Sequence, residues 1–180
     1  MYIEGKEIFV KAAEQEETGA VLELEKRNKE FFQQFTGLKE ESFYTIDGQL
    51  KRIRTFIQEA KEDKGYLFFI CLKKTEEVIG EIMLTEVVRQ NLQSCWIGYF
   101  LNKDHNGRGY MSEAVKLVVN HAFRQLSFHR IEAGVMPHNI GSMKVLLKAG
   151  FHKEGIARKN VCINGKWEDH QTLAIINEEE

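Results

Sequence analysis

The chain has 180 residues, of which 43% are hydrophobic, and this is enough for one domain with a core of its own. Its 25 basic and 27 acidic residues give a formal net charge of −2, which provides no overall basic field for nucleic acid. No apolar run is long enough to predict a transmembrane helix, and the amino end MYIEGKEIFV does not resemble a signal peptide. We therefore expect one cytoplasmic domain over residues 1–180, with no membrane or direct nucleic-acid partner.

The cysteines and histidines give no sign of a metal site or a disulfide framework. Cys71, Cys95 and Cys162 are odd in number, widely spaced and embedded in strand-like runs. We expect them to be buried free thiols in a reducing compartment. The six histidines form no pair four residues apart around a carboxylate, so we expect no metal.

The first half of the chain predicts a strand, two helices and three further strands. EIFVKAA, residues 7–13, is typical of a short strand, and apolar residues recur at helical spacing over 17–35. A second helix is predicted over 45–65, with Thr45 and Asp47 as candidate caps and Gly65 as its end. Three extended runs follow, separated by polar turns short enough for antiparallel hairpins: YLFFICLK, EVIGEIMLTEVV and SCWIGYFL.

The second half predicts a helix over residues 111–125, a strand over 129–136 and a short helix over 139–150. Gly150 stands where a left-handed residue commonly ends a helix. The Asn164-Gly165 pair indicates a tight hairpin between two closing strands. This order of elements predicts an α+β fold with a mixed sheet.

A glycine-flanked turn, NGRG, lies between the last extended run and the helix at 111–125. Gly107 and Gly109 have no Cβ atom, so a ligand can approach the backbone closely. The N–H groups of residues 107–112 can converge at the start of the helix, where the helix dipole and Arg108 add positive charge. A diphosphate suits this geometry, although most turns with the letters GRG only reverse the direction of the chain.

Two familiar phosphate-binding loops do not fit this turn. The nucleoside triphosphate loop needs a lysine followed by Ser or Thr after its last glycine, and here Tyr110 and Met111 follow. The dinucleotide fingerprint G-x-G-x-x-G fits only with Ser112 in place of the third glycine, and its acidic residue would be Glu132 in mid-strand. The upstream strands are also predicted to be antiparallel, which argues against a dinucleotide site.

The turn and its surroundings resemble the GCN5-related N-acetyltransferase (GNAT) superfamily, and in detail its RimJ/RimL branch. The acetyl-CoA loop of that family, Gln/Arg-x-x-Gly-x-Gly/Ala, aligns with NGRGYM, residues 106–111, and departs from it at the first and last positions. Further matches are WIGYFLNKDHNGRGYMSEA, HRIEAGVMPHNIGSMKVLLKAGFHKEG and the closing INGKWEDH. The resemblance implies a GNAT-like mixed, mostly antiparallel sheet flanked by helices.

The same resemblance implies that acetyl-CoA is the cosubstrate, with no metal. In the family, the strand before the loop splays away from its neighbour so that free backbone groups bond the pantetheine arm. By position, the cofactor-binding residues here would be Tyr99, Phe100, Leu101, Asn106, Gly107, Arg108, Gly109, Tyr110, Met111, Ser112 and Asn139.

The start of the second short helix offers a candidate acid. Asn139 is placed to cap the helix by accepting a hydrogen bond from the Ser142 N–H. Many family members carry a tyrosine further along this helix, where this chain has Leu146. The RimL-type branch instead has a serine one turn into the helix, and Ser142 matches it. The resemblance thus makes Ser142 the candidate that protonates the leaving thiolate.

Two glutamates are candidate general bases. Glu132 lies on the strand that leads to Asn139, and Glu81 interrupts the apolar run VIGEIML. A carboxylate among apolar neighbours has a raised pKa and suits base work. Strand alternation can equally turn either side chain toward solvent.

The expected activity is transfer of an acetyl group to an amine. The resemblance favours a protein N-terminal α-amino group of the ribosomal-protein type, whose pKa of about 8 demands only a weak base. The alternatives are a small amine, such as a polyamine or an amino sugar, and a CoA-binding regulatory module without catalysis. A monomer and a homodimer are both compatible with the sequence.

Overall fold

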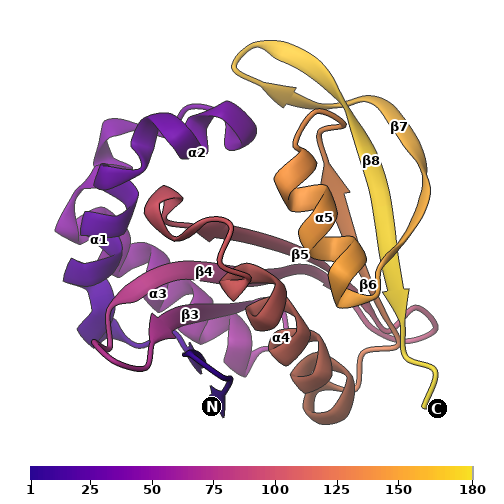
Figure 1. Cartoon of the computed structure of the whole chain (residues 1–180), viewed down its shortest axis with the longest axis horizontal. Coiled ribbons are helices and arrows are strands. Elements are labelled where there is room, and N and C mark those ends of the chain that lie inside the picture. Colours follow the sequence, from indigo (N-terminus) through magenta and orange to yellow (C-terminus); the bar gives the residue numbers. More distant parts are fainter. Residues whose placement is uncertain (180) are drawn as a thin grey trace.

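The computed structural model describes residues 1–179, which form one eight-stranded sheet with helices on both faces (Figure 1). The strand order is β1-β2-β3-β4-β5-β6-β8-β7, and every neighbouring pair is antiparallel except β5 and β6. The α+β fold with a mixed, mostly antiparallel sheet is therefore confirmed. The strands are β1 (Tyr2–Glu4), β2 (Ile8–Ala12), β3 (Tyr66–Leu72), β4 (Val78–Val88), β5 (Ser94–Leu101), β6 (Arg130–Val135), β7 (His152–Ile163) and β8 (Lys166–Ile176).

Five α-helices and three short 3-10 helices connect these strands within the described residues. The α-helices are α1 (Thr18–Arg27), α2 (Lys29–Thr36), α3 (Ile46–Lys61), α4 (Tyr110–Leu126) and α5 (Ile140–Ala149). The 3-10 helices are η1 (Gln15–Glu17), η2 (Glu41–Tyr44) and η3 (Lys103–His105). No helix among residues 1–179 has the length and apolar character needed to cross a membrane.

The predicted helix over 17–35 is in fact two helices. Asn28 separates α1 from α2 with φ −107° and ψ 11°, and its side chain donates a 2.9 Å hydrogen bond to the carbonyl of Leu24. Such a bond competes with the helical ladder, so the helical pattern of apolar residues continues while the axis changes direction. The sequence also gave no sign of β1, because this three-residue edge strand is mostly exposed and has no buried face.

Two of the local signals at the ends of the helices are confirmed, whereas Gly65 does not end its helix, because α3 already ends at Lys61. Thr45 caps α3 by accepting a 3.0 Å hydrogen bond from the Gly48 N–H, and Gly150 ends α5 at φ 102°. The closing hairpin turns at Asn164 and Gly165, with φ values of 52° and 80°. Both residue types tolerate this left-handed conformation, which a two-residue turn of this kind requires.

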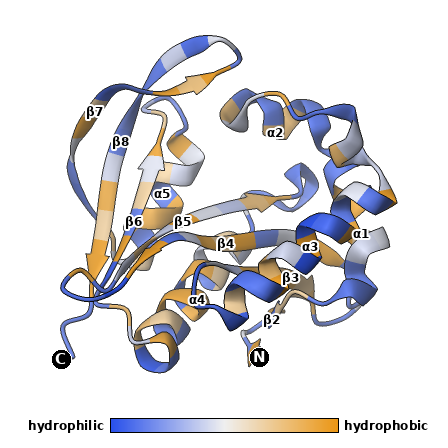
Figure 2. Cartoon of the chain, turned by 180° about the vertical axis from the view of Figure 1, so that it is seen from behind, coloured by the Kyte–Doolittle hydropathy of each residue, from blue (hydrophilic) through white to orange (hydrophobic). Residues whose placement is uncertain are grey.

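Two apolar clusters hold the layers together. The larger one packs α4 and α5 against one face of the sheet, with Val115, Val118 and Leu146 fully buried. The smaller one packs α1 and α3 against the other face, around Ile53 and Phe69. Figure 2 shows orange and blue alternating along α1 and α3, as amphipathic helices on a sheet require.

One expectation about the cysteines is wrong. Cys71 and Cys95 are buried free thiols, and burial raises their pKa values to about 11 and about 12. Cys162 is also a free thiol, but it is exposed. It lies on β7, which forms the outer edge of the sheet, so a strand-like run does not bury every residue in it.

Candidate active site

The glycine turn opens α4 in the geometry expected of an anion site. Gly107 and Gly109 have φ values of 79° and 84°, and Gly109 is the residue that immediately precedes α4. A Cβ on either glycine would meet no atom within 4 Å, so the space above the turn is open. The first N–H groups of a helix have no intrahelical partner, and the helix dipole makes this end positive. The turn can therefore cradle a phosphate group.

Two buried asparagines hold the segment that leads into the turn. Asn102 is 2% exposed, and its side-chain oxygen accepts a 3.3 Å hydrogen bond from the Asp104 N–H. Asn28 is 1% exposed, and its side-chain oxygen accepts a 2.9 Å hydrogen bond from the Lys103 N–H. The glycine turn is thus fixed both to the end of β5 and to the break between α1 and α2.

The two parallel strands β5 and β6 part soon after they begin to pair. Their register extends only from Ser94↔Arg130 to Trp96↔Glu132. Beyond Trp96, β5 continues to Leu101 with β4 as its only partner strand in the described chain, so one edge of its backbone can bond a ligand. Tyr99, Phe100 and Leu101, predicted to contact the pantetheine arm, lie on this stretch.

A cavity of about 420 Å³ extends along the open edge of β5. It is lined by Phe31, Phe32, Phe35, Tyr99, Phe100, Leu101, Asn106, Gly107, Gly109, Tyr110, Met111, Ser112, Asn139, Gly141, Ser142, Lys144, Val145 and Lys148. The structure thus brings together the predicted cofactor-binding residues other than Arg108, together with Ser142. The individual residues of α2 that form one side of the cavity were not predicted.

Tyr99 and Ser142 meet across the cavity wall. Their hydroxyl oxygens are 2.8 Å apart, and the Tyr99 hydroxyl also donates to the Ser142 carbonyl at 3.2 Å. Asn139 caps α5 as predicted, because its side-chain oxygen accepts a 3.2 Å hydrogen bond from the Ser142 N–H. Burial raises the pKa of Tyr99 well above its usual value, so its phenol stays protonated and can donate.

Sequence reasoning placed Tyr99 on the strand predicted to contact the cofactor but did not foresee the partner of its phenol. The alternation of β5 places Tyr99 on the same face as Ile97 and Leu101, which pack in the larger apolar cluster beside α4 and α5. That alternation was the available signal. Leu146, at the position where many family members have a tyrosine, is fully buried in the same cluster.

Glu81 does not line the cavity, and its carboxylate is bound by an arginine. Its side chain is 1% exposed, and Arg52 of α3 binds both of its carboxylate oxygens, one of them at 3.0 Å. Glu25 of α1, 5% exposed, lies beside this pair. Burial, and next the negative charge of Glu81, raise the pKa of Glu25 to about 7. The Arg52 guanidinium thus binds Glu81, and its charge also acts on Glu25.

Glu132 also lies outside the cavity lining. It is half-buried at the point where β5 and β6 part, and Arg130 binds it at 3.0 Å. Arg130 is shared with Glu154 of β7, which is also within hydrogen-bonding distance. Neither glutamate predicted as a base is among the residues that line the cavity.

The α2 side of the cavity is aromatic. Phe32 is buried against Phe100, with ring centroids 5.1 Å apart, and Phe31 and Phe35 lie beside it on the same helix. The lining residues include no carboxylate, and its charged members are Lys144 and Lys148. The cavity therefore does not suit a polycation, which needs carboxylates to replace its hydration.

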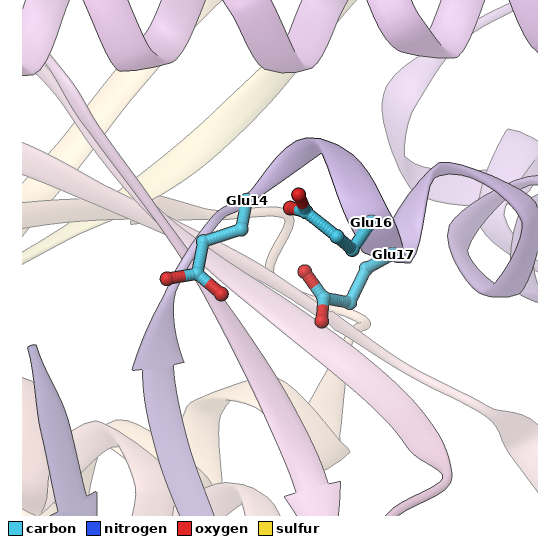
Figure 3. A group of neighbouring side chains, drawn as sticks. All are labelled: Glu14, Glu16 and Glu17. Carbon is cyan, nitrogen blue, oxygen red and sulfur yellow. The ribbon is translucent and has the colours of Figure 1, made fainter.

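One group of acidic side chains lies away from this cavity. Figure 3 shows Glu14, Glu16 and Glu17 gathered at η1, with carboxylate oxygens within 4.8 Å of one another. Lys11 forms ion pairs with Glu17 and, at 3.9 Å, with Glu14. Because a lysine already compensates part of this negative charge, the cluster alone does not make a metal site.

Comparison with known proteins identifies the family. A sequence profile of the acetyltransferase (GNAT) domain matches residues 8–152. The chain is 51% identical over 175 residues to the probable N-acetyltransferase YjcK of Bacillus subtilis (strain 168), and the match covers 97% of each chain.

Two solved structures are similar over nearly the whole chain. One is a ribosomal-protein-S5-alanine acetyltransferase from Vibrio fischeri, with a TM-score of 0.95 and 27% identity over 99% of this chain and 98% of that one. The other is Mycobacterium smegmatis RimJ in complex with CoA-disulfide, with a TM-score of 0.89 and 26% identity over 96% and 83% of the two chains. The chain belongs to the GNAT family, and it is an N-acetyltransferase related to the ribosomal-protein acetyltransferases. The resemblance to the RimJ/RimL branch is thereby confirmed.

Proposed function

We propose that the protein transfers the acetyl group of acetyl-CoA to the N-terminal α-amino group of a protein, of the kind found on ribosomal proteins. The observation that carries the proposal is the single cavity that joins the glycine turn, the Tyr99–Ser142 hydroxyl pair and the aromatic side of α2. It is supported by the likeness to an enzyme named for the alanine of ribosomal protein S5 and to RimJ in complex with a CoA disulfide.

The residues of the cavity fit acetyl-CoA, which supplies the acetyl group as a reactive thioester. The N–H groups of residues 107–112 would hold the diphosphate, because both glycines leave the turn open and the helix dipole is positive there. The free backbone edge of Tyr99, Phe100 and Leu101 would bond the amide groups of the extended arm. Asn139, at the start of α5, lines the same cavity.

Ser142 would act as the acid. As the new C–N bond forms and the C–S bond breaks, the sulfur gains negative charge, and the Ser142 hydroxyl can donate its proton there. The Tyr99 hydroxyl, whose pKa burial raises, lies 2.8 Å from the Ser142 oxygen, and it would turn its O–H from the Ser142 carbonyl to that oxygen as the serine gives up its proton. Two linked hydroxyls stabilise the departing thiolate better than one, since the second limits the charge left on the serine oxygen.

The acceptor amine loses its proton to solvent water or to a carboxylate reached through water. An α-amino group with a pKa of about 8 is partly neutral at pH 7, so a strong base is unnecessary. Of the two glutamates predicted as bases, we retain Glu132, because it lies where β5 and β6 part and the Arg130 hydrogen bond engages one of its two carboxylate oxygens. Arg52 occupies both carboxylate oxygens of Glu81, which leaves it poorly suited to accept a proton.

Acetyl-CoA turnover, followed as free-thiol release with a panel of acceptors, tests the proposal. Peptides beginning with Ala, Ser or Thr should be acetylated with a higher kcat/KM than spermidine, aminoglycosides or free lysine. The absence of carboxylates from the cavity lining is the reason to expect polycations to be poor acceptors. A higher kcat/KM for a small amine would overturn the proposed peptide acceptor. Binding of acetyl-CoA without thiol release for any amine would indicate a regulatory module.

A further inference from the structure

The turn of the β7–β8 hairpin is fastened to the end of α2, 131 residues away in the chain. The side-chain N–H of Asn164 donates a 3.1 Å hydrogen bond to the backbone oxygen of Gln33. Gly37, which follows α2, is buried, and a Cβ on it would lie 3.7 Å from the side-chain oxygen of Asn164. Ile163 is the only buried residue of β7. The hairpin turn and the end of α2 therefore cover each other, and they lie side by side in both views (Figure 1, Figure 2).

Helix α2 is eight residues long, and Phe32 is its only buried residue. The Gln33 side chain donates a 3.3 Å hydrogen bond to the Tyr44 hydroxyl, and Lys29 pairs with Glu41.

A helix of this length is not stable by itself, so its position depends on such contacts and on what holds its two ends. Asn28 holds the first end through its hydrogen bond to Lys103. The second end is held by Asn164 and by the ring of His138, whose centroid is 6.0 Å from that of Phe35.

The position of α2 sets the shape of the cavity, because Phe31, Phe32 and Phe35 all line it. The glycine turn and β5 would be covered by acetyl-CoA, which leaves the aromatic side of α2 for the acceptor. Asn164 therefore fastens the hairpin turn to the helix whose aromatic side chains would contact the acceptor.

We propose that Asn164 is a positioning residue that determines acceptor selectivity by fastening the hairpin turn to α2 through Gln33. This inference rests on the proposed function, since the acceptor is taken to be a peptide end. The role belongs to the acceptor side: the hydrogen bond joins the hairpin turn to α2, whereas Asn28 and Asn102 hold the segment that leads into the glycine turn.

The test uses variants that remove the hydrogen bond and keep the turn. Asn164→Gly tolerates the left-handed φ of 52°, and Asn164→Asp keeps the size of the side chain but cannot donate to Gln33. Lys166→Ala is the matched control, because this exposed residue of the same hairpin pairs with Glu168. Hydrogen exchange of residues 29–36 reports the fastening itself, and steady-state kinetics report its effect on the acceptor.

In both Asn164 variants the backbone amide hydrogens of residues 29–36 should exchange faster than in the wild type. The KM for an Ala-peptide should rise by about three- to ten-fold, as expected for one lost hydrogen bond. The KM for acetyl-CoA should change by less than about two-fold, and Lys166→Ala should resemble the wild type. Unchanged exchange in both variants would overturn the proposal, and so would an equal rise in both KM values. If the wild type acetylates only a small amine, the peptide function fails; the kinetics are then run with that amine, and the exchange result still decides the role of Asn164.

Discussion

The hydroxyl oxygen of Tyr99 lies 2.8 Å from that of Ser142, so β5 and α5 meet through two hydroxyl groups at the wall of the cavity. The two residues are 43 positions apart in the chain. Asn139 fixes the backbone of Ser142, and the register of β5 with β4 fixes that of Tyr99. The pair is thus preorganised, which favours interactions that strengthen as charge develops on a leaving group.

Ser142→Ala should lower kcat by about ten-fold to a thousand-fold and leave acetyl-CoA affinity nearly unchanged, because acid catalysis acts in the transition state. Steady-state rates and calorimetric titration of acetyl-CoA provide the comparison. The N-cap of α5 uses the Ser142 backbone N–H, so alanine retains it. A variant that loses stability but keeps its kcat would show that Ser142 only supports the helix.

Tyr99→Phe should lower kcat by about three- to thirty-fold, less than Ser142→Ala, since the phenol acts through the serine hydroxyl. In a Ser142→Ala background the same change should have little further effect, because the hydroxyl that Tyr99 supports is gone. The double-mutant cycle on kcat measures this. Additive losses would mean that the two hydroxyls act independently.

Gly109→Ala should weaken acetyl-CoA binding by about ten-fold or more, because a methyl group would enter the open space above the turn. Gly165→Ala is the matched control: its φ of 80° is close to the 84° of Gly109, and its surroundings are equally open. Both variants carry the same backbone strain, so both should lose similar stability. If calorimetry finds equal affinities for acetyl-CoA in the two variants, the glycine turn does not bind the cofactor.

Glu25→Gln should raise Tm at pH 8 by roughly 3–6 °C and change it little at pH 5. The pKa of Glu25 is raised from 4.5 to about 7 by burial and by Glu81, so the folded chain holds this proton more tightly than the unfolded chain. The stability that it contributes is therefore complete below about pH 4.5 and is lost as the pH rises through about 7. Glutamine mimics the protonated form at every pH. Calorimetric scans showing the same Tm difference at both pH values would contradict this account.

Glu132→Gln should lower kcat/KM for a peptide by about ten-fold at pH 6 and by less at pH 8.5, where more of the α-amino group is already neutral. Glu154→Gln is the control, since it removes the other carboxylate that binds Arg130. A pH profile unchanged by Glu132→Gln would leave solvent water as the proton acceptor.

The sequence determined those features that depend on neighbouring residues. Periodicity identified the helices and strands, while Thr45, Gly150 and the Asn164-Gly165 pair marked where elements begin, end and turn. The glycine turn was visible because Gly107 and Gly109 stand directly before an amphipathic helix. In each case the physical cause, a backbone preference or a capping hydrogen bond, acts within a few residues.

Tertiary structure decided the features that join distant segments. It determines that the Tyr99 hydroxyl lies beside that of Ser142, that Arg52 binds Glu81 and that Asn164 bonds to Gln33. It also places Cys162 on an exposed edge of the sheet. Local sequence patterns do not encode these contacts, because each depends on the order of strands in the sheet and on which face a helix covers. The sequence therefore predicted where the glycine turn lies, whereas packing decided which hydroxyl faces Ser142 and which side chains of α2 line the cavity.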